Sequence, residues 1–315
     1  LDKSLKNLII GQDHICTKIT KTIQRARSGV SDPQKPLGSF LFLGTTGVGK
    51  TLSARVLSKE VFGQESLIQL DMSEYSEKIA VSRLTGSSPG YVGHEEGGFL
   101  TESIRKKPYS VVLFDEIEKA HPEVVQVLLQ ILEEGKLTDG QGKVADFKHA
   151  VIIMTGNIGS ALFENKPQIG FADDNGGIDF DNISRKVKDE TKKFFKPELL
   201  NRIDDILIFK PLRKADSAKI VKLEMSKLEK RLKDKNLTIK LSKPALDFLI
   251  EKGTSPQYGA RPLKRIIQKF VENPLSEKIL ENGDLENKLI LFYKKGKSLA
   301  IKSVIDDDVK VLTSV

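Results

Sequence analysis

A glycine-rich turn that directly follows a short apolar run constrains this chain more than any other feature. Residues 40–43 are apolar, and residues 44–51 then read Gly-Thr-Thr-Gly-Val-Gly-Lys-Thr, which fits the pattern G-x-x-x-x-G-K-[ST]. The glycines let successive backbone N–H groups face a phosphate chain, and the positive end of the following helix points to the same place. The order of strand, turn and helix therefore predicts a site for a nucleoside triphosphate.

Every residue of this turn is expected to help hold the nucleotide. The side chain of Lys50 is expected to reach the β- and γ-phosphates, and the hydroxyl of Thr51 is expected to coordinate Mg²⁺. The predicted phosphate-binding residues are Gly44, Thr45, Thr46, Gly47, Val48, Gly49, Lys50 and Thr51.

The composition is that of a globular chain with a charge-rich surface. Of its 315 residues, 39% are hydrophobic and 30% are charged, which leaves room for two domains with sizeable cores. No apolar run approaches the roughly 20 residues of a membrane span, and no secretory leader is visible. The single cysteine, Cys16, allows no internal disulfide and indicates a reducing compartment. No membrane partner is expected.

The net charge of +8 raises the question of nucleic acid binding. The 51 basic residues are mostly lysines interleaved with acidic residues, as in residues 222–235, and only 6% of the chain is aromatic. This pattern is more typical of a solvated helical surface than of a nucleic-acid-binding surface. Nucleic acid is therefore not expected as a partner.

Apolar runs that alternate with helical segments predict an α/β fold with a mainly parallel sheet, because most of the intervening segments are long enough for crossovers. The predicted strands are residues 40–43, 67–70, 111–114, 151–154 and 206–209. The predicted αβα large domain covers residues 1–210. A lysine-rich helix over residues 215–235 then begins a smaller, mostly helical domain with short strands, over residues 211–315.

Two more strand ends carry polar residues that could work beside the glycine-rich turn. Residues 111–114 are apolar and lead into Asp115 and Glu116, which parallel topology brings to the carboxyl edge of the sheet. Asp115 is expected in the Mg²⁺ shell, and Glu116 is expected to polarise the attacking water. Asn157, after the run 151–154, is a candidate for contact with the γ-phosphate or the water.

Two arginines and two loops have open interpretations. Arg202 could act on the nucleotide of a neighbouring subunit or pair locally with Asp204 or Asp205, and Arg261 has the same ambiguity. Tyr91 and Val92 lie between glycines and form either a binding surface or a buried turn. The polar loop over residues 164–182 carries one apolar tripeptide and is longer than compact domains normally keep, so it is either functional or disordered. This tripeptide is Ile169, Gly170 and Phe171.

Six motifs now occur in a fixed order: GTTGVGKT, GYVGHEEGG, VVLFDEIEKAHPEV, MTGN, PELLNRID and GARPLKR. Together they make the chain resemble the second AAA+ module of the Clp ATP-dependent protein unfoldases, over nearly all of residues 1–295. The resemblance implies a homo-hexamer in the full-length protein, with ATP and Mg²⁺ between subunits. It also implies that Lys50 and Thr51 are the Walker A contacts and that Asp115 and Glu116 are the Walker B pair.

The resemblance gives further residues a role. It implies that Asn157 is the first sensor residue, that Arg202 is the finger acting on the neighbour's ATP, and that Arg261 is the second sensor, which couples the small domain to the nucleotide. The residues that it implies at the adenine are Ile9, Ile10 and Gly11.

Two loops are implied to meet proteins. Tyr91 and Val92 resemble the pore loop that grips an unfolded polypeptide substrate. The tripeptide of residues 169–171 resembles the loop that docks onto a ClpP-type peptidase, which favours a ClpC-like module. A ClpB-like disaggregase without a peptidase is the first alternative, and a nucleic-acid-acting AAA+ ATPase or a module that only binds ATP are the others. The implied location is the bacterial cytoplasm or a plastid-type stroma.

The sequence departs from the family pattern at four positions that surround the implied site. Thr45 stands where the family usually has Pro, and Gly156 replaces the usual Ser before Asn157. Leu199 and Asp205 replace the usual Phe and Glu around Arg202. None of these changes removes a catalytic group, so ATP hydrolysis remains the expectation.

Overall fold

The structure is a computed structural model that describes residues 1–63, 66–86, 97–164, 180–232, 237–255, 259–282 and 289–304. The chain forms two compact units. The large unit comprises Leu1–Thr45 and Gly49–Pro211, and the small unit comprises Thr46–Val48 and Leu212–Val315. Each unit has a hydrophobic core of its own.

A five-stranded parallel sheet forms the centre of the large unit. Its strands, in spatial order, are β2 (Leu67–Asp71), β3 (Val111–Asp115), β6 (Val151–Gly156), β1 (Gly38–Leu43) and β7 (Asp205–Ile208). These are the five apolar runs predicted as strands, so the predicted α/β fold is confirmed. The register aligns the carboxyl ends, because Leu43 pairs with Gly156 and Asp71 pairs with Asp115.

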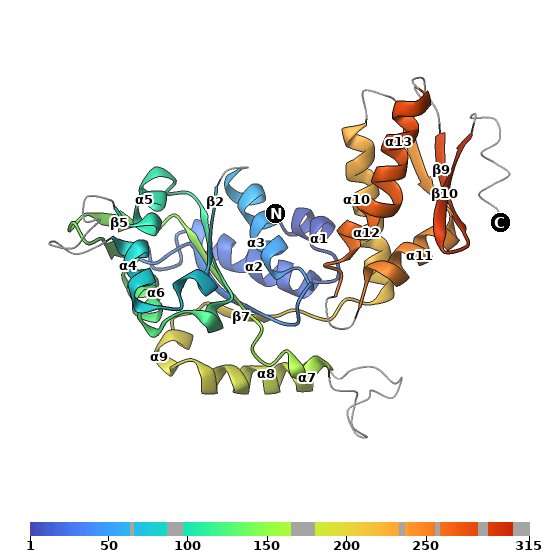
Figure 1. Cartoon of the computed structure of the whole chain (residues 1–315). Helices are drawn as coiled ribbons and strands as arrows, with labels where there is room; N and C mark the ends of the chain where they lie inside the picture. Colours follow the sequence, from blue (N-terminus) through green and yellow to red (C-terminus); the bar gives the residue numbers. More distant parts are fainter. Residues whose placement is uncertain are drawn as a thin grey trace. The chain divides into compact units, whose positions relative to one another are not determined.

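Helices cover both faces of this sheet (Figure 1). One face carries α1 (Asp2–Leu8), α2 (Asp13–Arg27) and α3 (Lys50–Phe62), and the other carries α4 (Lys78–Thr85), α5 (Phe99–Lys106) and α6 (Pro122–Glu134). The central strands are buried on both faces, since β1 and β6 are buried at every position while alternate side chains point in opposite directions. Further helical elements of the large unit are η1 (Met72–Tyr75), η2 (Ile117–Lys119), α7 (Ala161–Glu164), α8 (Phe180–Phe194) and α9 (Pro197–Leu200).

Helix α6 has the ends that its sequence predicts. Pro122 occupies the first helical turn, where its missing N–H costs nothing, and the Nδ1 atom of His121 accepts the backbone N–H of Glu123 at 3.2 Å. The helix ends at Gly135, whose φ of 63° lies in the left-handed region that glycine adopts readily. Proline favours the start of a helix and glycine its end, so the sequence itself marks both limits of α6.

The small unit packs helices against a three-stranded sheet. Its helices are α10 (Lys214–Arg231), α11 (Lys243–Gly253), α12 (Leu263–Ile267) and α13 (Asn273–Asn282), and its strands are β8 (Thr238–Leu241), β9 (Leu289–Lys295) and β10 (Ser298–Val304). The strand order is β10-β9-β8. Between α12 and α13 lies a π-helical turn, Gln268–Glu272, which ends two residues before Pro274. The turn is explained by this proline, which offers no N–H to the preceding turn of a regular helix.

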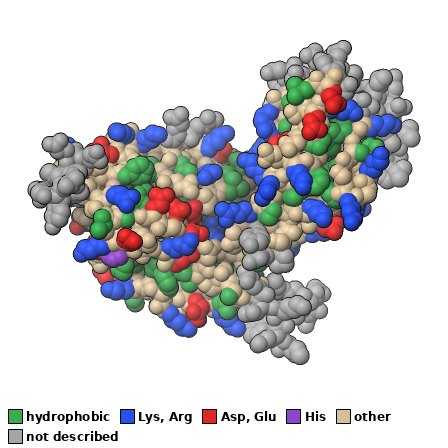
Figure 2. Space-filling view, viewed as in Figure 1, with side chains coloured by type: hydrophobic (Ala, Val, Ile, Leu, Met, Phe, Trp, Pro, Cys, Tyr) green, Lys and Arg blue, Asp and Glu red, His purple; other side chains and the backbone are tan. Residues whose placement is uncertain are grey.

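The surface carries charges of both signs. Lysine and arginine side chains are spread over the face seen in Figure 2, and acidic side chains lie among them. None of the helices in the described part of the chain has both the length and the apolar character needed to span a membrane.

A β-hairpin that packs against α5 and α6, formed by β4 (Lys136–Thr138) and β5 (Val144–Asp146), is not predicted from the sequence, because three-residue strands show no clear alternation. The buried carboxylate of Asp139 holds its turn. Asp139 accepts the backbone N–H groups of Gln141 at 2.9 Å and Lys143 at 2.8 Å, and also the guanidinium of Arg105 in α5 at 2.6 Å. Burial raises the pKa of Asp139, but these hydrogen bonds outweigh burial and hold it below its usual value.

We expect Asp139→Ala to lower the free energy of unfolding by about 1–3 kcal/mol, because Arg105 and two backbone N–H groups lose their acceptor. Asp146→Ala is the matched control, since Asp146 is exposed and accepts only the N–H of Lys148 among the described groups. The lowered pKa means that the stabilisation by Asp139 is present above about pH 4 and is lost as the pH falls below it. Urea unfolding of the three proteins at pH 7 and pH 3 measures both effects. Equal stability of the two variants at pH 7 would contradict the assignment.

Candidate functional site

The glycine-rich turn connects the buried strand β1 to helix α3. Three of its glycines have positive φ angles, namely 146° at Gly44, 76° at Gly47 and 104° at Gly49. Other residues rarely adopt these angles, so the path of the turn depends on glycine. Helix α3 then begins at Lys50, directly after Gly49, and its free N–H groups are therefore at the turn.

Lys50 directs its ammonium group back over the turn. Its Nζ atom donates to the carbonyl oxygens of Gly44 at 2.6 Å and Thr45 at 3.0 Å, and to the Oδ1 atom of Asn157 at 2.9 Å. Burial lowers the pKa of Lys50 to about 8, although the negative charges of Glu118, Asp115 and Glu116 act in the opposite direction. A partly buried cation at this position is a suitable partner for phosphate oxygens.

Asp115, at the carboxyl end of β3, faces Thr51 of α3. The Oγ1 atom of Thr51 lies 3.3 Å from Oδ1 and 3.2 Å from Oδ2 of this carboxylate. Two more side chains donate to Asp115, namely Thr155 of β6 through its hydroxyl and Gln69 of β2 through Nε2 at 3.2 Å. Strands on both sides of β3 therefore fix the orientation of Asp115.

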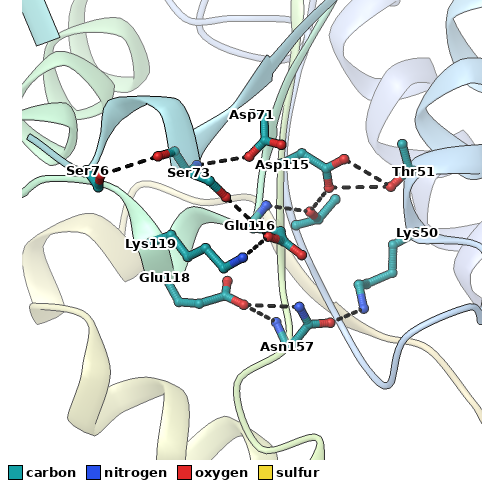
Figure 3. Close-up of polar contacts among 11 residues, drawn as sticks. Lys50, Thr51, Asp71, Ser73, Ser76, Asp115, Glu116, Glu118, Lys119 and Asn157 are labelled. Atoms are coloured by element: carbon teal, nitrogen blue, oxygen red, sulfur yellow. Dashed lines mark hydrogen bonds and ion pairs between the residues drawn. The ribbon is translucent and has the colours of Figure 1, made fainter. Parts of the chain in front are cut away.

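Glu116 has an unusual backbone conformation. Among the described residues it is the one non-glycine residue with positive φ, at 58°. Its N–H donates to the Oγ1 atom of Thr155 at 3.1 Å, and its carboxylate pairs with the ammonium group of Lys119 and lies 3.4 Å from the hydroxyl of Ser73 (Figure 3). Such strained conformations concentrate at functional sites, where the surrounding contacts hold them.

Asn157 follows the end of β6 and connects Lys50 to Glu118. Its backbone N–H and its Nδ2 atom both donate to the Oε1 atom of Glu118, at 3.0 and 3.1 Å. Figure 3 shows these contacts in one view with those of Asp115 and Thr51. The structure thus brings together Lys50 and Asn157, and also Thr51 and Asp115, at the carboxyl edge of the sheet.

The two predicted arginines are not part of this network. Arg202 forms a bidentate ion pair with Glu133 near the end of α6. Its Nη2 atom lies 2.6 Å from Oε1 of Glu133, and its Nε atom donates to Oε2 at 3.1 Å. This hydrogen bond raises the pKa of Arg202. Arg202 therefore pairs with Glu133 and not with Asp204 or Asp205, the two partners that the local alternative predicts. Asp204 instead accepts the N–H and the hydroxyl of Ser39, and Arg261 lies exposed in the small unit.

The predicted adenine-binding residues lie between α1 and α2. Ile9 is buried, while Ile10 and Gly11 are half-buried, and Gly11 has a φ of 78°. The adjacent Gln12 is fully buried, and its side chain binds both the N–H and the carbonyl of Lys210, at 3.0 and 2.8 Å. Gln12 thereby fixes the backbone at the end of the large unit.

The two predicted protein-binding loops lie outside the described residues. This applies to Tyr91 and Val92 and to the tripeptide of residues 169–171. The base of the first loop is described, because Gly86 and Gly97 form an antiparallel bridge across it.

Sequence reasoning missed several residues that hold the predicted ones in place. Thr155 directly follows the predicted strand 151–154, but a single hydroxyl after an apolar run does not by itself indicate a functional role. Glu118 and Lys119 read as ordinary charged residues after Glu116. Their proximity to two predicted acidic residues was the only available signal, because their contacts depend on the turn η2.

Known protein families match both parts of the chain. A family model described as an AAA domain of the Cdc48 subfamily matches residues 35–206, and a model described as the C-terminal, D2-small domain of ClpB protein matches residues 212–290. A probable ATP-dependent Clp protease ATP-binding subunit of Chlamydia pneumoniae is 49% identical over 284 residues, which cover 90% of this chain and 34% of that protein.

Two further relatives carry different names. ClpC, an ATP-dependent Clp protease ATP-binding subunit of Staphylococcus saprophyticus, is 48% identical over 298 residues, which cover 94% of this chain and 36% of that protein. The chaperone protein ClpB of Oceanobacillus iheyensis is 50% identical over 284 residues, which cover 90% and 35%. The chain therefore spans about a third of the length of the curated relatives it matches.

The pKa of Lys50 predicts a pH dependence of stability. The folded protein releases this proton near pH 8 and the unfolded chain near pH 10.5, so folding is penalised at pH 7 and the penalty disappears as the pH rises between these values. We expect the free energy of unfolding of the wild type, relative to Lys50→Met, to rise by up to about 3 kcal/mol from pH 8 to 10.5. Urea unfolding without nucleotide measures this difference.

Lys59→Met, at an exposed position of the same helix, is the control for the loss of a lysine. We expect the difference between this variant and the wild type to stay constant over the same pH range. A constant difference for Lys50→Met as well would contradict the assigned burial of the Lys50 charge.

Proposed function

The chain belongs to the Clp family of AAA+ ATPases, and we propose that it is the ATP-hydrolysing module that drives a Clp-type protein unfoldase. One observation carries this proposal. Lys50, Thr51, Asp115 and Asn157 meet at the carboxyl edge of a parallel sheet, where open α/β sheets bind their ligands, and Glu116 lies beside them (Figure 3).

The side chains at this edge fit a magnesium nucleotide. The hydroxyl of Thr51 and the carboxylate of Asp115 lie within 3.3 Å of each other, and both are oxygen ligands of the kind that Mg²⁺ prefers. Bound there with ATP, Mg²⁺ would neutralise charge that develops on the phosphates. Residues 44–51 would bind the phosphates through backbone N–H groups, and Ile9, Ile10 and Gly11 would bind the adenine.

Glu116 is the proposed general base. Its carboxylate would accept a proton from a water molecule while the water oxygen forms a bond to the γ-phosphorus. The bond from that phosphorus to the bridging oxygen breaks, which yields ADP and phosphate. The ion pair with Lys119 and the contact with Ser73 support this role, because they limit where the carboxylate can point. Asn157 and Lys50 would hold the γ-phosphate and the water in line.

We place the second half of the site on a neighbouring subunit of a homo-hexamer in the full-length protein. Arg202 would reach the neighbour's ATP, and Arg261 would couple the small unit to the nucleotide. The position of Arg202 supports this arrangement. Arg202 pairs with Glu133 and takes no part in the network that holds Lys50 and Asp115 in the same subunit. An arginine that reaches the γ-phosphate raises the rate of phosphoryl transfer by roughly 10³–10⁵-fold.

Hydrolysis would move unfolded protein substrates through the ring. Tyr91 and Val92 would grip the polypeptide by steric and apolar contact, and the tripeptide Ile169-Gly170-Phe171 would dock the ring onto a ClpP-type peptidase. The names of the relatives support a Clp chaperone but include both ClpC and ClpB. A disaggregase without a peptidase is therefore the second candidate. The bacterial relatives favour the bacterial cytoplasm over a plastid-type stroma.

The first test is the ATPase rate per subunit as a function of protein concentration. We expect the rate to rise with concentration, because Arg202 acts only across an interface. Glu116→Gln is expected to lower the rate roughly 10²–10⁴-fold through loss of the base, and Arg202→Ala roughly 10³-fold or more through loss of the finger. ATP binding, measured with a fluorescent analogue, is expected to persist in both variants.

Two conservative controls accompany this test. Glu123→Gln changes a glutamate at the start of α6 that pairs with Lys78, and Arg231→Ala changes an exposed arginine that pairs with Glu272. We expect both to hydrolyse ATP at the wild-type rate. A wild type that binds ATP but shows no turnover at any concentration would reduce this chain to a nucleotide-binding module.

The peptidase-docking proposal has its own test. In the full-length protein, replacing Ile169 and Phe171 by Ala is expected to abolish degradation of a substrate by an added ClpP-type peptidase, while the ATPase rate stays unchanged. Replacing Lys166 and Asp173 by Ala in the same loop is the control. Undiminished unfolding with no peptidase coupling in the wild type would favour the disaggregase.

A further inference from the structure

One carboxylate beside the phosphate site has no role in the function proposed above. Glu118 lies in η2, the short turn that follows β3 and Glu116. Its Oε1 atom accepts both the backbone N–H and the side-chain Nδ2 of Asn157, at 3.0 and 3.1 Å. A single oxygen thus fixes the backbone and the amide group of Asn157 at once.

These two hydrogen bonds also decide which end of the amide faces Lys50. With Nδ2 held by Glu118, Oδ1 accepts from the Nζ atom of Lys50 at 2.9 Å. Turning the amide by 180° would set its NH₂ group against the ammonium and its oxygen against the carboxylate, and both contacts would be repulsive. The orientation of Asn157 is therefore set by the charges on either side of it.

The second oxygen of Glu118 is in a different situation. Its Oε2 atom is buried and has no hydrogen-bond partner in the described part of the chain. A Cβ atom built at Gly156 would lie 3.1 Å from this oxygen and 3.2 Å from Leu43. A short side chain at position 156 would thus touch Oε2 directly, and a hydroxyl there could donate to it.

We propose that Glu118 is a positioning residue of the phosphate site, which aims the Oδ1 atom of Asn157 at Lys50, and that Gly156 leaves one oxygen of its carboxylate open to a further donor. The functional half of this inference rests on the proposed ATP hydrolysis. The structural half, the contact between position 156 and Glu118, does not.

The kinetic test compares Glu118→Ala, Glu118→Gln and Asn157→Ala. Glu118→Ala removes the acceptor, so we expect kcat to fall at least tenfold while KM and the affinity for a fluorescent ATP analogue change less than threefold. Glu118→Gln retains an acceptor oxygen and is expected to recover a substantial part of kcat. Because Glu118 acts through Asn157, adding Glu118→Ala to Asn157→Ala is expected to cause no further loss.

Two outcomes would overturn the functional half. A wild-type kcat in Glu118→Ala would do so, and so would a full additive loss in the double variant. If the wild type has no measurable turnover, the proposed hydrolysis fails instead, and the stability test decides the structural half alone.

The stability test compares Gly156→Ser with Gly156→Ala, each made in the wild type and in Glu118→Ala. Serine and alanine meet the same crowding at Cβ, so their difference isolates the hydroxyl. We expect the serine variant to melt about 3 °C above the alanine variant when Glu118 is present and at the same temperature when Glu118 is absent. Equal melting temperatures in the presence of Glu118, or an equal difference in both backgrounds, would refute the assigned contact.

Discussion

Lys50 holds a positive charge in a partly buried position at the sheet edge of the large unit, and the geometry of the site follows from the need to hold that charge. An unpaired buried ammonium is costly, so the chain surrounds it with the carbonyls of Gly44 and Thr45 and the oxygen of Asn157. These partners are available because β1 and β6 are parallel neighbours whose ends are in register. Burial keeps the pKa of Lys50 lowered despite the nearby carboxylates, and a negatively charged phosphate chain would favour the charged form further.

The sequence was sufficient for the framework of the large unit. Five apolar runs separated by crossovers allow little besides a parallel sheet, and Pro122 and Gly135 mark the ends of α6 because their backbone limits are local. The hairpin β4–β5 was missed because three-residue strands carry no pattern. Its turn depends instead on Arg105, a residue distant in sequence whose charge pairs with Asp139 only after folding.

The candidate site likewise contains residues that the sequence predicts and residues that it does not. Lys50 and Thr51 could be predicted because they close the glycine-rich turn that follows an apolar run. Asp115 and Asn157 could be predicted because each follows an apolar run, and strand ends meet at one edge of the sheet. Glu118 could not be predicted, because its role depends on the angle at which η2 leaves β3. The positive φ of Glu116 is part of that departure and is invisible in the sequence, since glutamate has no preference for it.

The ion pair between Arg202 and Glu133 bears on how such a site could be completed. Glu133 is more than half exposed, and a solvent-exposed ion pair contributes little to stability because water screens it. A phosphate group in a water-excluded interface would attract the same guanidinium more strongly, since the effective dielectric constant is lower there. Glu133 therefore keeps Arg202 ordered in a single subunit without competing effectively with a neighbour's nucleotide. Under the proposed function, assembly would exchange one carboxylate for a phosphate and would need no refolding of the segment that carries Arg202.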